Sequence, residues 1–214
     1  MNLPGHVGII PDGNRRWASR RGVGLSEAYD AGYRRLREAV EELNRLGVRS
    51  VSVYAMSRDN CVKRGKRELV LLHHLASRAF RELREDDRLR DEGIRIQVLG
   101  DLTLLPVEVR REALEAVRAT STRSGGLLLI ALCYSGRWEV EYYTARGLVP
   151  PSLSLPGVDL LIRTGGYRRI SSFLPLLLEY AEMYFTPTLW PDFDRGELSR
   201  ALEWFSMQQR KFGK

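Results

Sequence analysis

The sequence predicts an α/β fold in which helices cover both faces of a parallel β-sheet. Short, mostly apolar runs alternate along the chain with longer segments whose apolar residues recur at steps of three and four. Apolar runs of this kind are typical of strands that are buried on both faces, as in parallel sheets. Polar clusters directly follow several of the runs, and ligands bind at this edge of such sheets.

The composition indicates one globular domain, which we place at residues 1–214. Hydrophobic residues make up 43% and charged residues 29% of the chain, a balance usual for a protein with its own core. No apolar run has the length of a membrane span and no signal peptide precedes the first strand, so we expect a cytoplasmic protein. Much of the net charge of +7 is arginine interleaved with glutamate on helix faces, which favours solvated ion pairs over a nucleic-acid surface.

The first strand and the turn after it form the most informative stretch of the chain. Residues 6–10 are apolar, Pro11-Asp12-Gly13-Asn14 breaks the strand, and Arg15-Arg16-Trp17 opens a helix. The free N–H groups of a helix start and the bidentate arginines suit a phosphate. A carboxylate beside them suits a phosphate only when a divalent cation such as Mg²⁺ lies between the two. The simpler alternative is that Asp12 caps the helix and the arginines form a solvated face.

The other elements follow from their periodicity. We predict helices over 26–46, 66–90, 107–121 and 195–211, a short helix after 134–138, and strands over 48–56, 94–99, 127–133 and 158–162. Ser26 is the predicted N-cap of the first long helix, and Gly47 ends that helix. Residues 144–157 contain prolines and no clear periodicity, which predicts a surface linker or a mobile loop. The apolar helix face from Leu69 to Leu83 is predicted mostly as ordinary core, with a wall for a bound chain as the alternative.

Polar clusters are expected along one edge of the sheet, because each follows a predicted strand. They lie at residues 12–16, 57–60, 135–137 and 163–169. The motif Arg-Thr-Gly-Gly-x-x-Arg-x-Ser, which runs from Arg163 to Ser171, has the composition of a diphosphate cradle. Its glycines let the backbone come close, its arginines supply charge, and its serine adds a donor. It is neither a Walker loop nor a Rossmann fingerprint.

Three residues outside these clusters are also candidates for chemistry. Glu182 is a lone acid among aromatic residues, and such a carboxylate is costly to bury unless it pairs with an arginine, which the spacing favours, or binds a metal. Cys61 and Cys133 belong to no C-x-x-C motif, and three histidines are too few for a Cys/His zinc site. We therefore predict two free thiols.

Three blocks of the sequence resemble the cis-prenyltransferase family, whose best-known member is undecaprenyl diphosphate synthase. They are HVGIIPDGNRRWA at 6–18, VYAMSRDN at 53–60 and DLLIRTGGYRRISSFLPLLLEYAEMYFTPTLWPDF at 159–193. The Pro-Asp-Gly-Asn-Arg-Arg sequence is nearest to the archaeal branch. The resemblance implies a six-stranded, mostly parallel sheet flanked by helices, with a hydrophobic tunnel beside the sheet, and a homodimer.

The activity that the resemblance implies is a Mg²⁺-dependent condensation. Isopentenyl diphosphate units are added, with cis double bonds, to an allylic diphosphate such as farnesyl or geranylgeranyl diphosphate. The polyprenyl diphosphate product serves as a precursor of glycosyl-carrier lipids and is handed over to a membrane, which brings the enzyme to the membrane periphery. No nucleic acid takes part.

The family's functional residues carry over to the matching positions of this chain. Asp12 is implied as a catalytic residue and metal ligand, Asn60 as the catalytic proton acceptor, and Glu182 as the second metal ligand. The implied substrate-binding residues are Gly13, Asn14, Arg15, Arg16, Trp17, Tyr29, Ser57, Arg58, Asp59, Lys63, Arg163, Arg169, Ile170 and Ser171.

The chain departs from the better-known members mostly on the allylic side of the site. Those members carry arginine, histidine, tryptophan, arginine, glutamate and asparagine where this chain has Leu25, Tyr29, Cys61, Lys63, Tyr167 and Ser172. The tail from Arg210 to Gly213 resembles one that reaches into the partner's active site, but it has Lys211 in place of an arginine. Two alternatives stay open, a non-catalytic subunit of a heteromeric prenyltransferase and a short-chain or branching isoprenyl diphosphate synthase.

Overall fold

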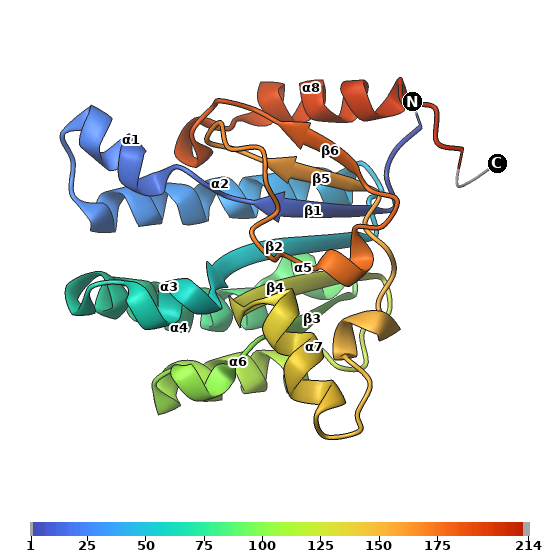
Figure 1. Ribbon diagram of the computed structural model, residues 1–214. Helices are drawn as coiled ribbons and strands as arrows, with labels where there is room; N and C mark the ends of the chain where they lie inside the picture. Colours follow the sequence, from blue (N-terminus) through green and yellow to red (C-terminus); the bar gives the residue numbers. More distant parts are fainter. Residues whose placement is uncertain (1, 212–214) are drawn as a thin grey trace.

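The computed structural model describes residues 2–211, which form a six-stranded sheet. All six strands are parallel, in the order β3-β4-β2-β1-β5-β6 (Figure 1). Their bounds are β1 His6–Ile10, β2 Ser50–Ser57, β3 Ile94–Leu99, β4 Gly126–Tyr134, β5 Leu160–Arg163 and β6 Glu182–Phe185. The predicted parallel α/β sheet is confirmed.

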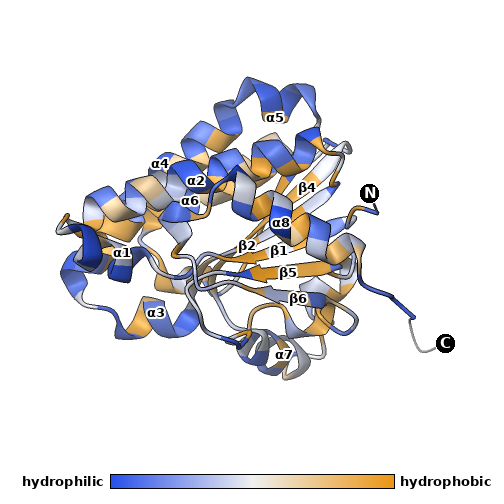
Figure 2. Ribbon diagram, turned by 90° about the horizontal axis from the view of Figure 1, so that it is seen from above, coloured by the Kyte–Doolittle hydropathy of each residue, from blue (hydrophilic) through white to orange (hydrophobic). Residues whose placement is uncertain are grey.

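Helices lie on both faces of the sheet. Helices α2, α4, α6 and α8 cover one face and α7 covers the other, while α1 and α3 lie at the carboxyl edge of the strands (Figures 1 and 2). The helix bounds are α1 Asn14–Arg21, α2 Leu25–Arg45, α3 Arg58–Lys63, α4 Lys66–Glu85, α5 Asp87–Asp91, α6 Val107–Ala119, α7 Gly136–Thr144 and α8 Arg195–Ser206. Short 3₁₀ turns span Leu102–Leu104, Pro151–Ser154, Pro175–Leu177 and Trp190–Asp192. Within residues 2–211, no helix combines the length and the apolar character that crossing a bilayer requires.

Strand β4 illustrates why the strands read as continuous apolar runs. Its Leu128 and Leu132 pack in the core beneath the long helices, whereas Leu129 and Ala131 pack in a second core on the opposite face of the sheet. Successive side chains of a strand point to opposite faces. Because both faces are covered, neither set is polar, and the alternation of a half-exposed strand is absent.

Three predicted helix boundaries differ from the structure. Helix α2 begins directly after Gly24, so Ser26 lies inside its first turn rather than at its N-cap. The single helix predicted over 66–90 is interrupted at Asp86, whose carboxylate accepts hydrogen bonds from the backbone N–H groups of Arg88 and Leu89 and caps α5. Helix α8 ends at Ser206, before the predicted 211, and the tail residues 212–214 lie outside the described part of the chain.

The neighbouring strands β1 and β5 create a crevice at the carboxyl edge. Ile10 of β1 lies opposite Arg163 of β5. From β1 the chain crosses to β2 on one side, and from β5 it crosses to β6 on the other. The loops therefore leave the two strands in opposite directions, which opens a ligand-binding crevice in parallel sheets. Asp12 and Arg163 stand at this point.

The prediction of two free thiols is wrong. Cys61 on α3 and Cys133 near the end of β4 form a disulfide, with their Cα atoms 5.7 Å apart. Because the two cysteines have a sequence separation of 72, no local motif indicated that they would pair. Strand β4 lies beside β2, and β2 runs directly into α3, so the strand order brings the two sulfur atoms together.

Candidate active site

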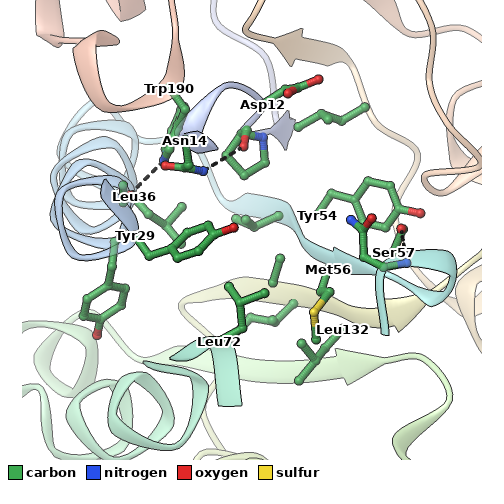
Figure 3. Close-up of a pocket in the computed structure, with 18 of the residues that line it drawn as sticks. Asp12, Asn14, Tyr29, Leu36, Tyr54, Met56, Ser57, Leu72, Leu132 and Trp190 are labelled. Atoms are coloured by element: carbon green, nitrogen blue, oxygen red, sulfur yellow. Dashed lines mark hydrogen bonds between the residues drawn. The ribbon is translucent and has the colours of Figure 1, made fainter. Parts of the chain in front are cut away.

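A cavity of about 1240 Å³ opens at the carboxyl edge and continues between the sheet and helices α2 and α4 (Figure 3). Its mouth is polar and includes Asp12, Asn14 and Ser57, whereas its interior is lined by apolar side chains such as Leu36, Leu72 and Leu132. A cavity with a charged mouth and an apolar interior suits a ligand with an ionic head and a hydrocarbon tail.

One face of α4 forms both core and cavity wall. Leu72, Leu75, Ala79 and Leu83 line the cavity. Leu83 also belongs to the buried core, and Leu69 and Leu72 pack against it. From Leu72 to Leu83 the wall follows α4 over about 16 Å, at about 1.5 Å per residue. The prediction of ordinary core is therefore confirmed for Leu69, Leu72 and Leu83, and the same helix face also supplies the apolar wall of the cavity.

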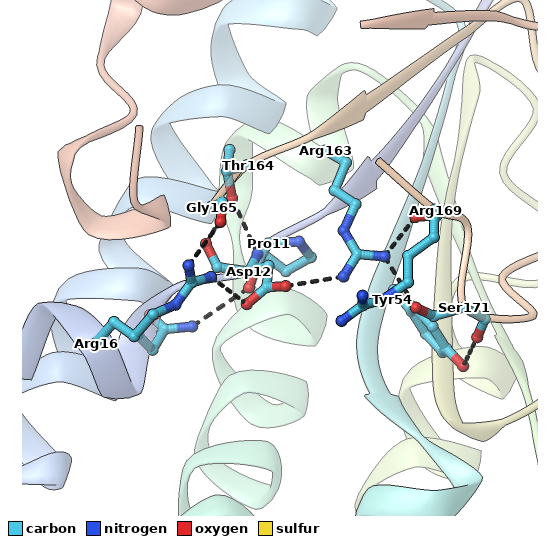
Figure 4. Close-up of polar contacts among 10 residues, drawn as sticks. Pro11, Asp12, Arg16, Tyr54, Arg163, Thr164, Gly165, Arg169 and Ser171 are labelled. Atoms are coloured by element: carbon cyan, nitrogen blue, oxygen red, sulfur yellow. Dashed lines mark hydrogen bonds and ion pairs between the residues drawn. The ribbon is translucent and has the colours of Figure 1, made fainter. Parts of the chain in front are cut away.

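The Asp12 carboxylate is the centre of the polar mouth (Figure 4). Its Oδ1 accepts a hydrogen bond from Nη2 of Arg16 at 3.1 Å, and its Oδ2 accepts one from Nη2 of Arg163 at 2.9 Å. Arg16 also donates to the backbone oxygen of Gly165 at 2.7 Å. One carboxylate thus holds a guanidinium group from α1 and one from β5 in fixed positions, and both cations face the cavity.

The backbone of Asp12 is fixed by the fifth strand and the loop after the sixth. The Thr164 hydroxyl donates to the Asp12 carbonyl oxygen at 2.7 Å and accepts from its N–H at 2.9 Å, and the N–H of Trp190 donates to the same carbonyl at 3.1 Å. Gly165 follows with φ +82°, where a Cβ would lie 2.5 Å from Nη2 of Arg16 and 3.0 Å from the Asp12 carbonyl oxygen. Only glycine fits there, which gives the Gly-Gly of the motif its physical reason.

Arg163 is almost fully buried, with 4% of its surface exposed. It donates to Ser171 Oγ at 2.9 Å and to the backbone oxygen of Arg169. Ser171 and Ser172 adopt left-handed backbone conformations, with φ values of 50° and 64°, which are uncommon for residues with side chains and cluster at functional sites. The Tyr54 hydroxyl donates to the carbonyl oxygen of Ser171 at 3.1 Å, and burial raises the pKa of Tyr54, so this donor keeps its proton.

The Tyr167 ring gathers three guanidinium groups. The central carbon of the guanidinium lies 4.1 Å from the ring centroid for Arg169, 4.9 Å for Arg16 and 5.8 Å for Arg163. A ring face attracts cations without neutralising their charge. At the position where the better-known relatives carry a glutamate, this chain therefore holds its arginines together and leaves their positive charge available to a ligand.

Helix α3 forms the opposite side of the mouth. Ser57 caps it, since its Oγ accepts the N–H of Asn60 at 3.1 Å, and Arg58 pairs through Nε with Oδ2 of Asp101 at 3.2 Å. All four residues from Ser57 to Asn60 line the cavity.

Arg64 lines the cavity in place of Lys63, which the family resemblance had implied as a substrate-binding residue. Lys63 does not line the cavity; its side chain is 71% exposed and pairs with Asp59 at 2.9 Å. Arg64 lines it instead, donating to the Tyr29 hydroxyl at 3.0 Å and pairing with Glu68 at 3.0 Å. Tyr29 in turn donates to Glu68, and burial raises the pKa of its hydroxyl. Sequence reasoning missed Arg64, and the only signal for it was a second cation beside Lys63.

Most, but not all, of the predicted residues meet at the cavity. Those that line it are Asp12, Gly13, Asn14, Arg15, Arg16, Tyr29, Ser57, Arg58, Asp59, Asn60, Arg163 and Ser171. Trp17 instead donates through Nε1 to Asp192 at 2.8 Å, and Ile170 packs against the core on the face opposite the long helices. Arg169 reaches the site through Tyr167 and through its backbone oxygen.

Glu182 is separated from Asp12 by the length of a strand. It is the first residue of β6 and lies opposite Leu160, which lies opposite Val7, whereas Asp12 follows the end of β1. At about 3.3 Å per residue, the five positions from Val7 to Asp12 correspond to roughly 16 Å. Between residues 2 and 211, no group of three or more His, Cys, Asp or Glu side chains is arranged to hold a metal ion. Within one chain, Glu182 is therefore not placed beside Asp12, and its role as the second metal ligand stays a prediction.

A family model described as putative undecaprenyl diphosphate synthase matches residues 10–148 and 146–213. The chain belongs to this prenyltransferase family. It is 41% identical, over the full length of both chains, to the tritrans,polycis-undecaprenyl-diphosphate synthase (geranylgeranyl-diphosphate specific) of Aeropyrum pernix. An isoprenyl transferase of Chlorobaculum tepidum is 36% identical, with 99% of this chain and 86% of that protein covered.

Solved structures show the same fold. Lavandulyl diphosphate synthase from Lavandula x intermedia, in complex with dimethylallyl diphosphate, superposes with a TM-score of 0.88 at 28% identity, with 99% of both chains covered. A probable undecaprenyl diphosphate synthase from Campylobacter jejuni gives 0.80 at 26% identity, with both chains fully covered. The protein is thus a cis-prenyltransferase, an enzyme that elongates prenyl chains.

Proposed function

We propose that this protein elongates geranylgeranyl diphosphate to a long polyprenyl diphosphate that serves as a glycosyl-carrier lipid precursor. The observation that carries this proposal is the cavity, in which a mouth lined by arginines continues into an apolar interior walled by α2 and α4. Five of the curated relatives that match along at least 99% of this chain, from Aeropyrum, Thermococcus, Sulfolobus and Pyrococcus, are named as specific for geranylgeranyl diphosphate. Farnesyl diphosphate is the other primer that the sequence suggested.

The two diphosphates are assigned to the two sides of Asp12. Asn14, Arg15 and Arg16, at the start of α1, would bind the allylic diphosphate, because a helix N-terminus presents free N–H groups and a positive dipole end. Arg163 and Ser171, with Arg169 stacked nearby, would bind isopentenyl diphosphate. When the allylic C–O bond breaks, negative charge grows on the leaving diphosphate, and guanidinium groups already held in place stabilise it without reorganising.

Asn60 is assigned to the proton step. Carbon–carbon bond formation leaves a proton to be removed from the isopentenyl unit, and we assign its acceptance to the side-chain oxygen of Asn60. Asn60 lies on α3 and lines the mouth of the same cavity as Asp12. Ser57 and Arg58 would orient this segment through the α3 cap and the ion pair with Asp101.

The donor set at the mouth fits Mg²⁺ bound together with substrate. Mg²⁺ is usually held by one or two carboxylates plus substrate phosphates rather than by an all-protein cage. Asp12 supplies one hard anionic oxygen donor beside the proposed diphosphate positions. When bound, the ion would neutralise charge on the leaving diphosphate. Glu182, distant along β6, is not part of the set that we assign to this ion.

A homodimer and delivery to a membrane complete the proposal. Met183 exposes apolar surface on the edge strand β6, which supports association of two copies along this side. Each CH₂ group that leaves water contributes about 0.8 kcal/mol, so a long polyprenyl product would partition into a bilayer after release. We assign the enzyme to the cytoplasmic side of that membrane. Sedimentation of the purified protein tests the dimer, and flotation with vesicles tests the membrane contact.

A short-chain or branching synthase is the second candidate. It is favoured by the similarity in fold to lavandulyl diphosphate synthase and by the Arg-Ile-Ser-Ser-Phe-Leu-Pro segment from Arg169 to Pro175. The long apolar wall beyond Leu72 argues for elongation, because a product of two short units would leave most of it unused. The non-catalytic subunit is less well supported, since Asp12 and Asn60 both face the cavity.

A product assay separates the candidates. The purified protein receives Mg²⁺, labelled isopentenyl diphosphate and, one at a time, dimethylallyl, geranyl, farnesyl or geranylgeranyl diphosphate, and products are sized by reversed-phase chromatography. We expect a ladder of long products with geranylgeranyl diphosphate as the preferred primer. A single short or branched product from dimethylallyl diphosphate would favour the second candidate. No incorporation with any primer would contradict both and direct attention to a partner subunit.

A further inference from the structure

Helix α3 has few anchors for an element that lines the mouth of the cavity. It is six residues long and none of its side chains is buried. A helix this short is not stable by itself and depends on tertiary contacts. The contacts that hold it include the Ser57 cap, the Arg58–Asp101 ion pair and the disulfide from Cys61 to Cys133. At its far end, the C-cap residue Arg64 contacts Tyr29 and Glu68.

The other end of the disulfide lies on a rigid part of the sheet. Cys133 is fully buried in β4, and its carbonyl oxygen accepts the N–H of Asp101 at 3.1 Å. The preceding Gly100 packs so closely that a Cβ there would lie 1.8 Å from the carbonyl oxygen of Leu132. Asp101 is also the partner of Arg58. The ends of β3 and β4 thus form one platform to which α3 is tied twice, once by charge and once covalently.

We propose that the Cys61–Cys133 disulfide is a positioning device for the Ser57–Asn60 segment, and that cleaving it slows turnover. This inference rests on the proposed function of Asn60. Asn60 immediately precedes Cys61, so the covalent bond restricts the residue assigned to the proton step. A shift of about 1 Å in a reacting group can cost about 100-fold in rate. With the bond open, the Ser57–Asn60 end of α3 keeps a cap and a half-exposed ion pair, which are weak restraints, while Arg64 holds the far end of the helix.

The chemistry of opening is thiol–disulfide exchange with a dithiol reductant. A thiolate of the reductant attacks Sγ of Cys61, which is only partly buried, whereas Cys133 is fully buried. The S–S bond breaks and the Cys133 sulfur leaves as a thiolate. The second thiol of the reductant then releases Cys61, so the reductant ends as a disulfide and the protein gains two electrons and two protons as two thiols.

The two sides of the mouth respond differently to this change. Asp12, Arg16 and Arg163 are held by β1, β5 and the Thr164 hydroxyl, none of which touches the disulfide. Binding of the allylic diphosphate is therefore expected to persist after reduction, while the step that needs Asn60 slows. A general loss of structure would instead raise KM and lower kcat together.

The test compares oxidised and dithiothreitol-reduced wild-type protein with the Cys61→Ser/Cys133→Ser double variant. Thiol titration reports the state of the bond, and primer-extension kinetics report kcat and the KM for the allylic diphosphate. We expect reduction to lower kcat at least about fivefold, with KM changed by less than about twofold. The double variant should have the lower kcat with or without reductant. If the double variant does not fold, the comparison of oxidised with reduced wild-type protein is sufficient for the test.

Amide hydrogen exchange gives a readout that does not depend on catalysis. Reduction should accelerate exchange in residues 57–64 by at least about tenfold, while β3 and β4 stay protected. Equal exchange in both states, or equal kcat in both states, would overturn the positioning role. The oxidised protein could lack all transferase activity and still show faster exchange at 57–64 on reduction. That result would refute the proposed function but would still support the restraint of α3 by the Cys61–Cys133 disulfide.

Discussion

The carboxylate of Asp12 lies 2.9 Å from the guanidinium of Arg163, although the two residues are 151 positions apart in the chain. The contact joins the loop that follows β1 to the last residue of the neighbouring strand β5. Arg163 is buried and Asp12 faces the cavity mouth, so the pair places one fixed positive and one fixed negative group where the diphosphates and their metal ion are proposed to bind.

Replacing Asp12 by asparagine tests the role of its charge. Asp12→Asn keeps an oxygen acceptor of the same size but leaves the buried Arg163 without its anion. Turnover should fall at least about 100-fold, and the free energy of unfolding should fall by about 1–3 kcal/mol. Steady-state kinetics and denaturant unfolding measure the two effects. As a matched control, Asp87→Asn removes an exposed carboxylate that pairs with Arg90, and both quantities should stay near wild type. Normal turnover in Asp12→Asn would contradict the assignment.

Substitution of Tyr167 separates its ring from its hydroxyl. Tyr167→Phe preserves the aromatic face that gathers Arg16, Arg163 and Arg169, and its kinetics should match those of the wild type. Tyr167→Ala removes the face and should cost about 1 kcal/mol, read as a several-fold rise in the KM for isopentenyl diphosphate. If the phenylalanine and alanine variants behave alike, the cation–π platform has no part in binding.

The length of the product should depend on the wall contributed by α4. Ala79 lines the cavity, so Ala79→Phe should fill part of the interior and shift the product ladder to shorter chains. Val70, on the same helix, is exposed, and Val70→Phe serves as the control. Chromatography of the extracted products compares them. Identical product ladders from Ala79→Phe and Val70→Phe would show that the growing chain does not occupy this part of the cavity.

His6 should make the fold sensitive to mild acid. Burial lowers its pKa below 6.5, because the ring is shielded from water between the Pro156 carbonyl oxygen at 2.9 Å and Ser52 Oγ at 2.6 Å. The Pro156 carbonyl oxygen can only accept, so Nδ1 carries a proton and donates to it. In the neutral ring, Nε2 then accepts from the Ser52 hydroxyl.

The lowered pKa of His6 determines how the free energy of unfolding changes with pH. The stability that His6 contributes is complete above pH 6.5 and is lost as the pH falls through the lower, folded-state pKa, since the unfolded chain takes up the proton first. Unfolding free energies measured from pH 7.5 downward should therefore decline below pH 6.5. The decline should be smaller in His6→Phe and unchanged in His74→Gln, where the ring is exposed. A His6→Phe slope equal to that of the wild type would refute this account.

Much of the fold was predictable because its strands are buried on both faces. The predicted third strand, 94–99, coincides with β3, and the fourth and fifth predicted strands lie within one or two residues of β4 and β5. The apolar pattern did not predict the edge strand β6, because its side chains are only partly buried and Met183 is exposed. A half-covered strand of four residues carries too little apolar contrast to be seen in a sequence.

The site was predictable where a motif fixes local geometry and not where contacts depend on strand order. Asp12 and Arg163 were expected to converge because each follows a parallel strand. The disulfide was not, because the chain gives no sign that β4 lies beside β2. Glu182 was paired with Asp12 through a family motif, and a motif carries no measure of position along a strand. Lys63 and Arg64 differ only in which way their side chains project from the end of α3.

The central place of β1 in the sheet governs when the protein can become active during synthesis. One side of β1 pairs with β2 early, but its other side stays an open edge until residues 160–163 have been made. Until then the nascent chain presents unpaired backbone groups, which invite aggregation. The diphosphate cradle closes only when this last central pairing forms. A rise in melting temperature on adding diphosphate would therefore report that the whole chain, and not only its first half, has folded.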